Sequence, residues 1–178
     1  MTPDNDERSG ASLDLDPPAW GERLAGAYRE IGDRAMRDLP IFNGALSVEA
    51  VGFRKIGGRI VGVLVTPWFM NVVMSADGGA AQPSAVPGSS LRFRFPAGDI
   101  DLTVSEVASA GRIASCSLFS PMFEFEDMTC ARTTAEAALA ALMTPDDNAE
   151  AARRRDHPSA SSIDRRNFLR GVLTERRG

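Results

Sequence analysis

Residues 60–74 limit what this chain of 178 residues can fold into. They read IVGVLVTPWFMNVVM and are almost continuously apolar. A transmembrane helix needs about 20 such residues, and this shorter stretch is interrupted by Pro67, which has no N–H to donate. β-branched residues cluster before the proline. We therefore predict a buried strand that runs to Thr66, breaks at Pro67 and continues as a second extended segment.

A second apolar stretch, residues 116–125 (CSLFSPMFEF), has a similar pattern. Both stretches contain a hydroxyl residue, Pro, a large apolar residue and Phe, at 66–69 and 120–123. Since Pro is excluded from central strands, we expect both motifs at ends or edges of a sheet. Trp, Met and Phe are typical of adaptable protein-binding surfaces. We predict one partner-binding patch made of Trp68, Phe69, Met70, Phe119, Met122 and Phe123. The alternative, equally weighted, is that these side chains complete the core beneath a loop.

Two segments have the periodicity of amphipathic helices. Asp16 followed by two prolines is typical of a helix start, and apolar residues then recur at helical spacing as far as the turn at 38–40. Residues 128–143 form a second helical pattern that is rich in Ala and is followed by Pro145. The abundance of Ala indicates close packing of this helix on a sheet.

Alternating apolar and polar residues predict the strands. Gly57-Gly58 is typical of a two-residue hairpin, which joins a strand at 46–56 to the apolar stretch that begins at residue 60. Further alternating segments lie at 91–95, 100–104 and 112–119. The expected fold class is α+β, with an antiparallel sheet of about five to six strands and the N-terminal and Ala-rich C-terminal helices packed on it.

Composition divides the chain into three parts. Residues 1–15 are polar and predicted to be disordered, 16–144 form a single domain, and 145–178 form a flexible linker and a basic tail. Residues 1–150 hold 12 Lys and Arg against 21 Asp and Glu, a net charge of −9, whereas 151–178 hold 8 Arg against 3 acids, a net charge of +5. This acidic domain argues against nucleic acid as a partner, and we expect no stable membrane insertion. The Gly-, Pro- and Ser-rich loop at 75–90 is predicted to be mobile.

Signals for catalysis are weak. The chain lacks Gly-rich nucleotide-binding, P-loop, HExxH and GxSxG motifs. Its single histidine, His157, lies in the tail, and Cys116 and Cys130 form no CxxC pair, so we expect no metal site and no cofactor. Glu124 and Glu126 are predicted to share a strand face, which is more often solvated than metal-binding. The N-terminal segment has no apolar core of a signal peptide, so we expect a cytoplasmic protein.

Four segments, in order, carry a family resemblance: GVLVTPWFMN (62–71), FPAG (95–98), CSLFSPMFEFED (116–127) and TTAEAALAALM (133–143). Together they closely resemble the HybE family of nickel–iron hydrogenase assembly chaperones. The resemblance covers roughly residues 18–144 and extends more weakly into the arginine-rich tail.

The resemblance implies a cytoplasmic accessory protein with no catalytic residues and no cofactor. Such a protein helps the hydrogenase mature and holds back twin-arginine export until the subunits are loaded and assembled. Its partners are expected to be the small-subunit precursor, the large subunit, or both. The alternative is a chaperone or adaptor for a different exported redox enzyme, and an enzymatic function ranks third.

The tail segment 164–170, DRRNFLR, resembles part of the twin-arginine export motif. In that motif a hydroxyl residue precedes two arginines, any residue, Phe, Leu and usually Lys, so Asp164 and Arg170 depart from it. No apolar segment follows, and the tail therefore cannot direct export of this chain. One interpretation is a short amphipathic basic helix. The other is mimicry of a client signal, with the tail docking on the acidic domain. We predict the partner-binding residues of the tail to be Arg165, Arg166, Phe168 and Leu169.

Overall fold

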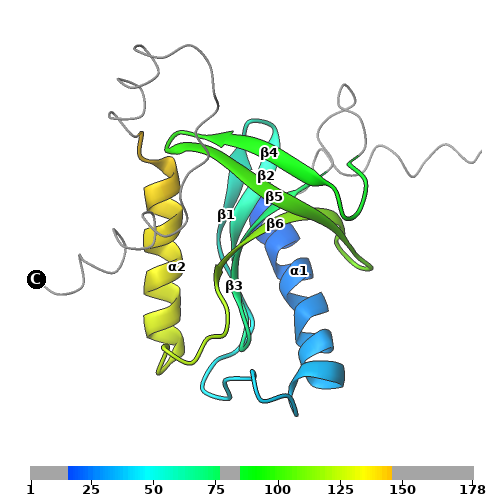
Figure 1. The fold of residues 1–178 in the computed structure, drawn as a ribbon, viewed down its shortest axis with the longest axis vertical. Helices are drawn as coiled ribbons and strands as arrows, with labels where there is room; N and C mark the ends of the chain where they lie inside the picture. The colour runs from blue at the N-terminus through cyan, green and yellow to red at the C-terminus, as the bar shows by residue number, and fades with distance from the viewer. Residues whose placement is uncertain (1–15, 77–84, 146–178) are drawn as a thin grey trace, which may run out of the picture.

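The computed structural model of the chain describes residues 16–76 and 85–145. Two long helices flank one six-stranded sheet (Figure 1). In chain order the elements are α1 (Pro17–Ile31), the π-helical turn η1 (Gly32–Met36), β1 (Glu49–Ile56), β2 (Arg59–Val65), β3 (Met70–Ser75), β4 (Ser90–Phe95), β5 (Gly98–Val107), β6 (Gly111–Phe119) and α2 (Met128–Met143).

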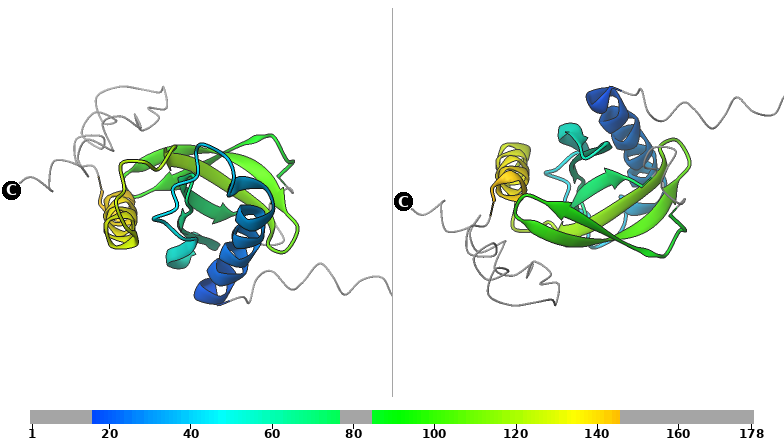
Figure 2. Two further views of the ribbon diagram at one scale, coloured as in Figure 1. Left: turned by 90° about the horizontal axis from the view of Figure 1, so that it is seen from below. Right: turned by 90° about the horizontal axis from the view of Figure 1, so that it is seen from above.

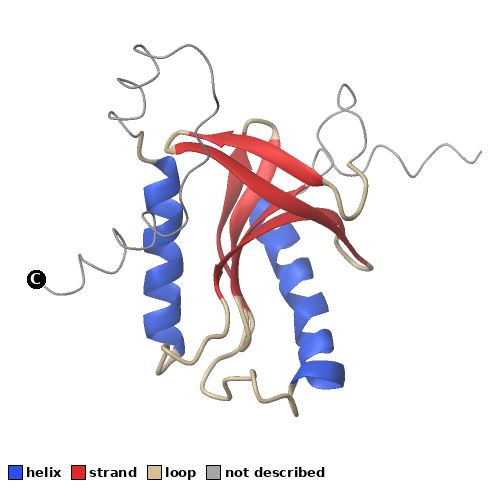
Figure 3. Cartoon of the chain, in the orientation of Figure 1, coloured by secondary structure: helices blue, strands red, loops and turns tan. Residues whose placement is uncertain are grey.

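The sheet is antiparallel throughout, with the strand order β1-β2-β3-β6-β5-β4. Two hairpin-connected groups, β1–β3 and β4–β6, join where β3 pairs with β6. The sheet bends strongly, so that β4 and β5 run across the direction of β1–β3 (Figure 3). The turn between β4 and β5 thereby reaches the end of α2, where Ala97 N donates to Leu142 O at 3.1 Å.

The helices cover opposite faces of β1 and β2 (Figure 2). Along β2, Val61, Val63 and Val65 pack in the cluster that contains α2, while Ile60 and Leu64 pack in the cluster that contains α1. Every residue of β2 is buried, which explains why its sequence from Ile60 onward is continuously apolar instead of alternating.

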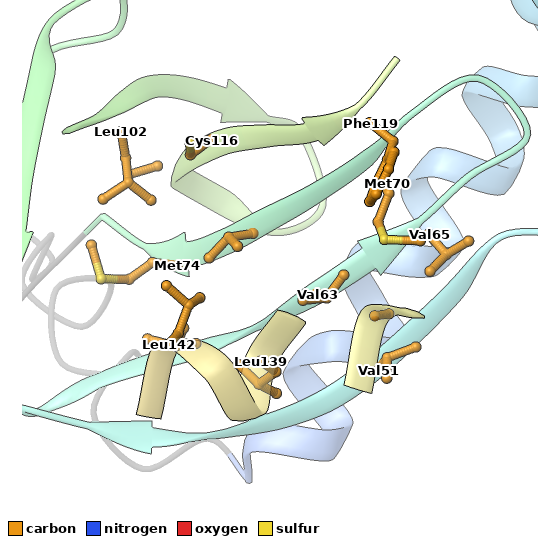
Figure 4. Packing of buried hydrophobic residues seen from close by; sticks show 14 of the residues in the cluster. Val51, Val63, Val65, Met70, Met74, Leu102, Cys116, Phe119, Leu139 and Leu142 are labelled. Carbon is orange, nitrogen blue, oxygen red and sulfur yellow. The ribbon is translucent and has the colours of Figure 1, made fainter. Parts of the chain in front are cut away.

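Close packing of α2 depends on small residues. Ala131, Ala135 and Ala138 are fully buried against the sheet, and Leu139 and Leu142 extend into the cluster shown in Figure 4. On the α1 side, Trp20 and Leu24 are the large buried anchors. The predicted α+β architecture, an antiparallel sheet with an N-terminal and a C-terminal helix packed on it, is confirmed.

Three details differ from the sequence-based expectations. The first strand begins at Glu49 and not at residue 46, and the N-terminal helix leaves α-helical geometry at Ile31 and continues as η1. The third concerns the end of β6. Strand β6 ends at Phe119, because Pro121 cannot donate to a ladder, so Glu124 and Glu126 lie in a loop and share no strand face.

Several predictions concern residues outside the described ranges. These are the predicted disorder of 1–15, the predicted mobility of the loop at 75–90 as far as it concerns residues 77–84, and the predicted linker and tail beyond residue 145, including His157. Within the described ranges, no helix is long and apolar enough to cross a membrane.

Candidate functional site

Three connections meet at one end of the sheet, at the bottom of Figure 1. They are residues 37–48 between η1 and β1, residues 66–69 between β2 and β3, and residues 120–127 between β6 and α2. We call this region the loop end. It contains both of the hydroxyl–proline motifs that the sequence singles out.

Asn43 joins the three connections. Its side-chain Nδ2 donates to the main-chain oxygens of Met122 at 3.0 Å and Phe125 at 2.9 Å. Its main-chain N–H donates to Pro67 O at 2.9 Å, and its Oδ1 accepts from Ala45 N at 3.0 Å. One amide side chain therefore holds loops that are distant in sequence, which makes the surface of the loop end preorganised.

The hydroxyl residue of each motif has a structural role. Thr66 Oγ1 accepts from the N–H groups of Trp68 at 3.3 Å and Phe69 at 2.9 Å, which closes the turn around Pro67. Ser120 Oγ donates to Trp68 O at 3.4 Å and so connects the second motif to the first. The two motifs that looked alike in sequence thus lie side by side in the fold.

Four of the six residues predicted to form an exposed patch are buried in the core: Trp68, Met70, Phe119 and Met122. Trp68 is only 6% exposed and stacks on Phe42 with a centroid distance of 6.0 Å. The prediction of one exposed patch made of all six is therefore wrong, and the alternative of a core beneath a loop holds for these four. The physical reason is that both faces of the sheet are covered, so side chains at the strand ends turn inward.

The remaining two predicted residues reach the surface. Phe123 is 59% exposed. Phe69 is half-buried, and its ring lies edge-to-face with that of Tyr28 at a centroid distance of 5.5 Å. Burial at this contact raises the pKa of the Tyr28 hydroxyl. Whether Phe69 and Phe123 bind a partner stays a prediction.

The sequence reasoning missed other exposed apolar residues at the loop end. Leu39 and Ile41 flank Pro40 in the connection between η1 and β1. The signal was the run Leu-Pro-Ile-Phe after a helix end, where polar turn residues are usual. We call Leu39, Ile41 and Phe123 the loop-end patch. Among the described residues the other exposed large apolar side chains are Ile31, at the end of α1, and Val86, in the connection before β4.

The charges beside the patch are acidic. Asp38, Glu124 and Glu126 are exposed, and within residues 16–76 and 85–145 none of them has an ion-pair partner within 4 Å. Arg34 and Arg37 nearby are each paired with an acidic residue one turn earlier, at 3.7 and 2.7 Å. The uncompensated charge at the loop end is therefore negative.

An ion pair fixes α2 beside the loop end. The Arg132 guanidinium donates two hydrogen bonds to the Glu49 carboxylate, from Nε at 2.6 Å and from Nη2 at 2.7 Å. These bonds lower the pKa of the Glu49 carboxyl and raise the pKa of Arg132. Asp127 caps the same helix, since its Oδ1 accepts from Cys130 N at 2.8 Å. These contacts hold the first turn of α2, where the 120–127 connection ends.

The described residues offer little for metal chemistry. No three His, Cys, Asp or Glu side chains within 16–76 and 85–145 come together in a way that could hold a metal ion. Cys116 is buried and Cys130 is half-buried. The predicted tail contacts Arg165, Arg166, Phe168 and Leu169 lie outside the described residues.

Comparison with known proteins identifies the family. Residues 19–171 match the family described as NiFe-hydrogenase assembly, chaperone, HybE. The chain belongs to this family. The match includes the domain described above and continues past residue 145 into the arginine-rich tail, as far as residue 171.

Two curated relatives of this HybE-family protein carry the name HupJ. The hydrogenase expression/formation protein HupJ of Bradyrhizobium diazoefficiens is 65% identical over 170 residues, covering 96% of this chain and 98% of the relative. A protein named probable rubredoxin HupJ, of Rhodobacter capsulatus, is 37% identical over 127 residues. That alignment covers 71% of this chain but only 46% of the longer relative.

The fold has a counterpart among solved structures. The solution structure of HybE from Escherichia coli matches with a TM-score of 0.60 and 21% sequence identity, covering 84% of this chain and 89% of HybE. At this level of identity the match supports the fold alone. It agrees with the antiparallel sheet and two flanking helices described above.

Proposed function

We propose that this HybE-family protein is a non-catalytic, cytoplasmic chaperone that binds a precursor subunit of a nickel–iron hydrogenase before twin-arginine export. The partner is the small-subunit precursor, the large subunit, or both. The observation that carries the proposal is the loop-end patch, which contains three of the five exposed large apolar side chains of the described residues, on connections that Asn43 holds together.

Such a surface suits a chaperone for physical reasons. Exposed apolar side chains that gather in one region, with polar groups around them, mark protein-binding sites in soluble proteins. A surface held in place before binding loses less conformational entropy when a partner docks. Asn43 and the ion pair between Glu49 and Arg132 supply this rigidity. Acidic groups at the rim favour a partner with basic residues.

Substitution of Phe123 tests the proposal. Phe123→Ser should weaken binding of the purified subunit precursor by about 2 kcal/mol, or roughly 30-fold, the loss expected for an aromatic hot spot. The matched control is Val86→Ser, because Val86 is 66% exposed but lies away from the loop end. Equal affinity for both variants, with both folded, contradicts the loop end as the binding surface.

The identity of the client is tested separately. A tagged copy is recovered from cells that express the hydrogenase, and the captured proteins are identified by mass spectrometry. Recovery of the small-subunit precursor or the large subunit supports the proposal. Recovery of precursors of other exported redox enzymes, without hydrogenase subunits, favours the alternative of an adaptor for a different exported enzyme.

A second candidate is cooperation with a rubredoxin. The relative named probable rubredoxin HupJ is more than twice as long as the part that this chain matches. A tetrahedral all-sulfur iron site needs four cysteine thiolates, and this chain has two cysteines. This chain cannot supply such a site by itself, so a separate rubredoxin is a candidate partner. A titration with purified rubredoxin tests this, and absence of binding with and without the hydrogenase subunit contradicts it.

A further inference from the structure

The loop end combines apolar and acidic groups in an alternating arrangement. Glu124 directly follows Phe123, and Asp38 directly precedes Leu39. All four side chains are exposed, and the two connections that carry them are held together by the hydrogen bonds of Asn43. Carboxylates and large apolar groups are thus offered by neighbouring residues of one rigid surface.

The chemistry of this surface defines the peptide that fits it. Arginine is preferred for carboxylates because its planar guanidinium can donate two parallel hydrogen bonds. Large apolar side chains next to the arginines are needed to cover Leu39, Ile41 and Phe123. The matching ligand is a short peptide in which arginines stand one or two residues from Phe and Leu.

The chain carries such a peptide itself. Residues 165–169 read Arg-Arg-Asn-Phe-Leu, and residues 151–178 have a net charge of +5 against −9 for residues 1–150. The family match runs through this segment to residue 171, although the described domain ends at residue 145. The segment therefore lies within the part of the chain that matches the family.

The length of chain is sufficient for docking on the same molecule. Helix α2 has 16 residues and is about 24 Å long, and it starts at the loop end and finishes at the opposite end of the domain (Figure 1). The tail must return over this distance. The residues between 145 and 164 can span at most about 60 Å when fully extended, so the return is possible with slack.

We infer that residues 164–173 dock on the loop end of their own chain. Arg165 and Arg166 pair with the carboxylates of Glu124, Glu126 and Asp38, and Phe168 and Leu169 cover Ile41 and Phe123. Tethering gives the segment an effective concentration on the order of millimolar at that surface, so even a weak contact is occupied. The inference does not depend on which client the protein serves.

Site-specific crosslinking in the full-length purified chain tests the docking. A photoreactive phenylalanine analogue replaces Phe168, and the crosslinked residues are found by peptide mass spectrometry. The expected products join position 168 to residues 38–43 or 120–127. Mixing isotope-labelled and unlabelled chains distinguishes the sources, because docking on the same chain gives no mixed products. Crosslinks elsewhere on the domain, or mainly mixed products from a second copy, overturn the inference.

Charge variants test the contact chemistry. Glu124→Gln combined with Glu126→Gln should lower the crosslink yield several-fold at low salt, and the yield of the unaltered chain should fall as salt is raised. The matched control is Glu106→Gln, an exposed carboxylate on β5 away from the loop end. Equal yields for the double variant and the control overturn the proposed pairing. All these substitutions are at exposed positions, so folding is preserved.

Discussion

Asn43 Nδ2 lies 3.0 Å from the main-chain oxygen of Met122, 79 residues further along the chain. With the second bond to Phe125 O, this contact closes the loop end. Asn43→Ala leaves both oxygens without their donor, and we expect a loss of about 1–3 kcal/mol in the free energy of unfolding. Urea denaturation measures it.

The control for this variant is Asn71→Ala. Asn71 lies on β3, and its Oδ1 is buried without a hydrogen-bond partner within the described part of the chain. Its removal should cost less than that of Asn43, because no partner is left unsatisfied. Equal losses for the two variants would show that the Asn43 bonds do not hold the loop end together.

Trp68 and Phe123 should separate stability from binding. Trp68 is buried and stacked on Phe42, so Trp68→Ala should cost about 3–5 kcal/mol of stability. Phe123→Ala should change the free energy of unfolding by less than about 0.5 kcal/mol, because the side chain is mostly exposed. For client affinity per folded molecule the order should be reversed, with Phe123→Ala weakening binding more than Trp68→Ala. Urea unfolding measures the stability of each variant, and titration measures its affinity for the client. A large loss of stability for Phe123→Ala would assign it to the core.

The fold was largely predictable from local patterns, and the site was not. The apolar run before Pro67, the glycine hairpin and the Ala-rich helix each specify their own element through periodicity or turn chemistry. Whether Trp68 and Met122 are exposed depends on contacts with Phe42 and Asn43, which are distant in sequence. Such contacts between distant residues produce no periodic pattern in the sequence. Exposure of Leu39 and Ile41 likewise follows from the path of a connection and not from a pattern.

The ion pair between Glu49 and Arg132 should make stability depend on pH. The pKa of Glu49 in the folded protein is below its usual value of 4.5, so the stabilisation is present above that value and is lost as pH falls through the lowered pKa. Glu49→Gln should therefore slightly lower the urea midpoint at pH 7, since both groups are partly solvated. The difference should shrink as pH falls below 4.5. Glu124→Gln, at an exposed position without an ion-pair partner among the described residues, is the control and should show no such trend.

Gly52 occupies a position where a side chain is excluded. Its φ is +64°, within the irregular pairing between Val51 and Arg54, and a Cβ there would lie 2.6 Å from Leu139 Cδ2. Gly52→Ala should lower the free energy of unfolding by about 1–3 kcal/mol through strain and displacement of α2. Gly58→Ala has a similar φ of +78° but open space around its Cβ, so thermal unfolding should show a smaller loss. A smaller loss at Gly52 than at Gly58 would contradict the close contact with α2.

The docked tail should compete with a client that carries a twin-arginine signal. A client can bind only while the loop end is free, so its apparent affinity is reduced by the fraction of free surface. For a tail with a dissociation constant near 0.1 mM and an effective concentration on the order of millimolar, the reduction is about tenfold. Arg165→Glu with Arg166→Glu, or deletion of residues 161–178, should therefore tighten binding of a small-subunit signal peptide about tenfold, measured by calorimetry at low salt. Arg176→Glu with Arg177→Glu makes the same change of charge beyond the Phe-Leu pair and should have a much smaller effect. Weaker binding after substitution of Arg165 and Arg166 would instead show that the tail contacts the client directly. Unchanged binding would show that the tail has no part in client recognition.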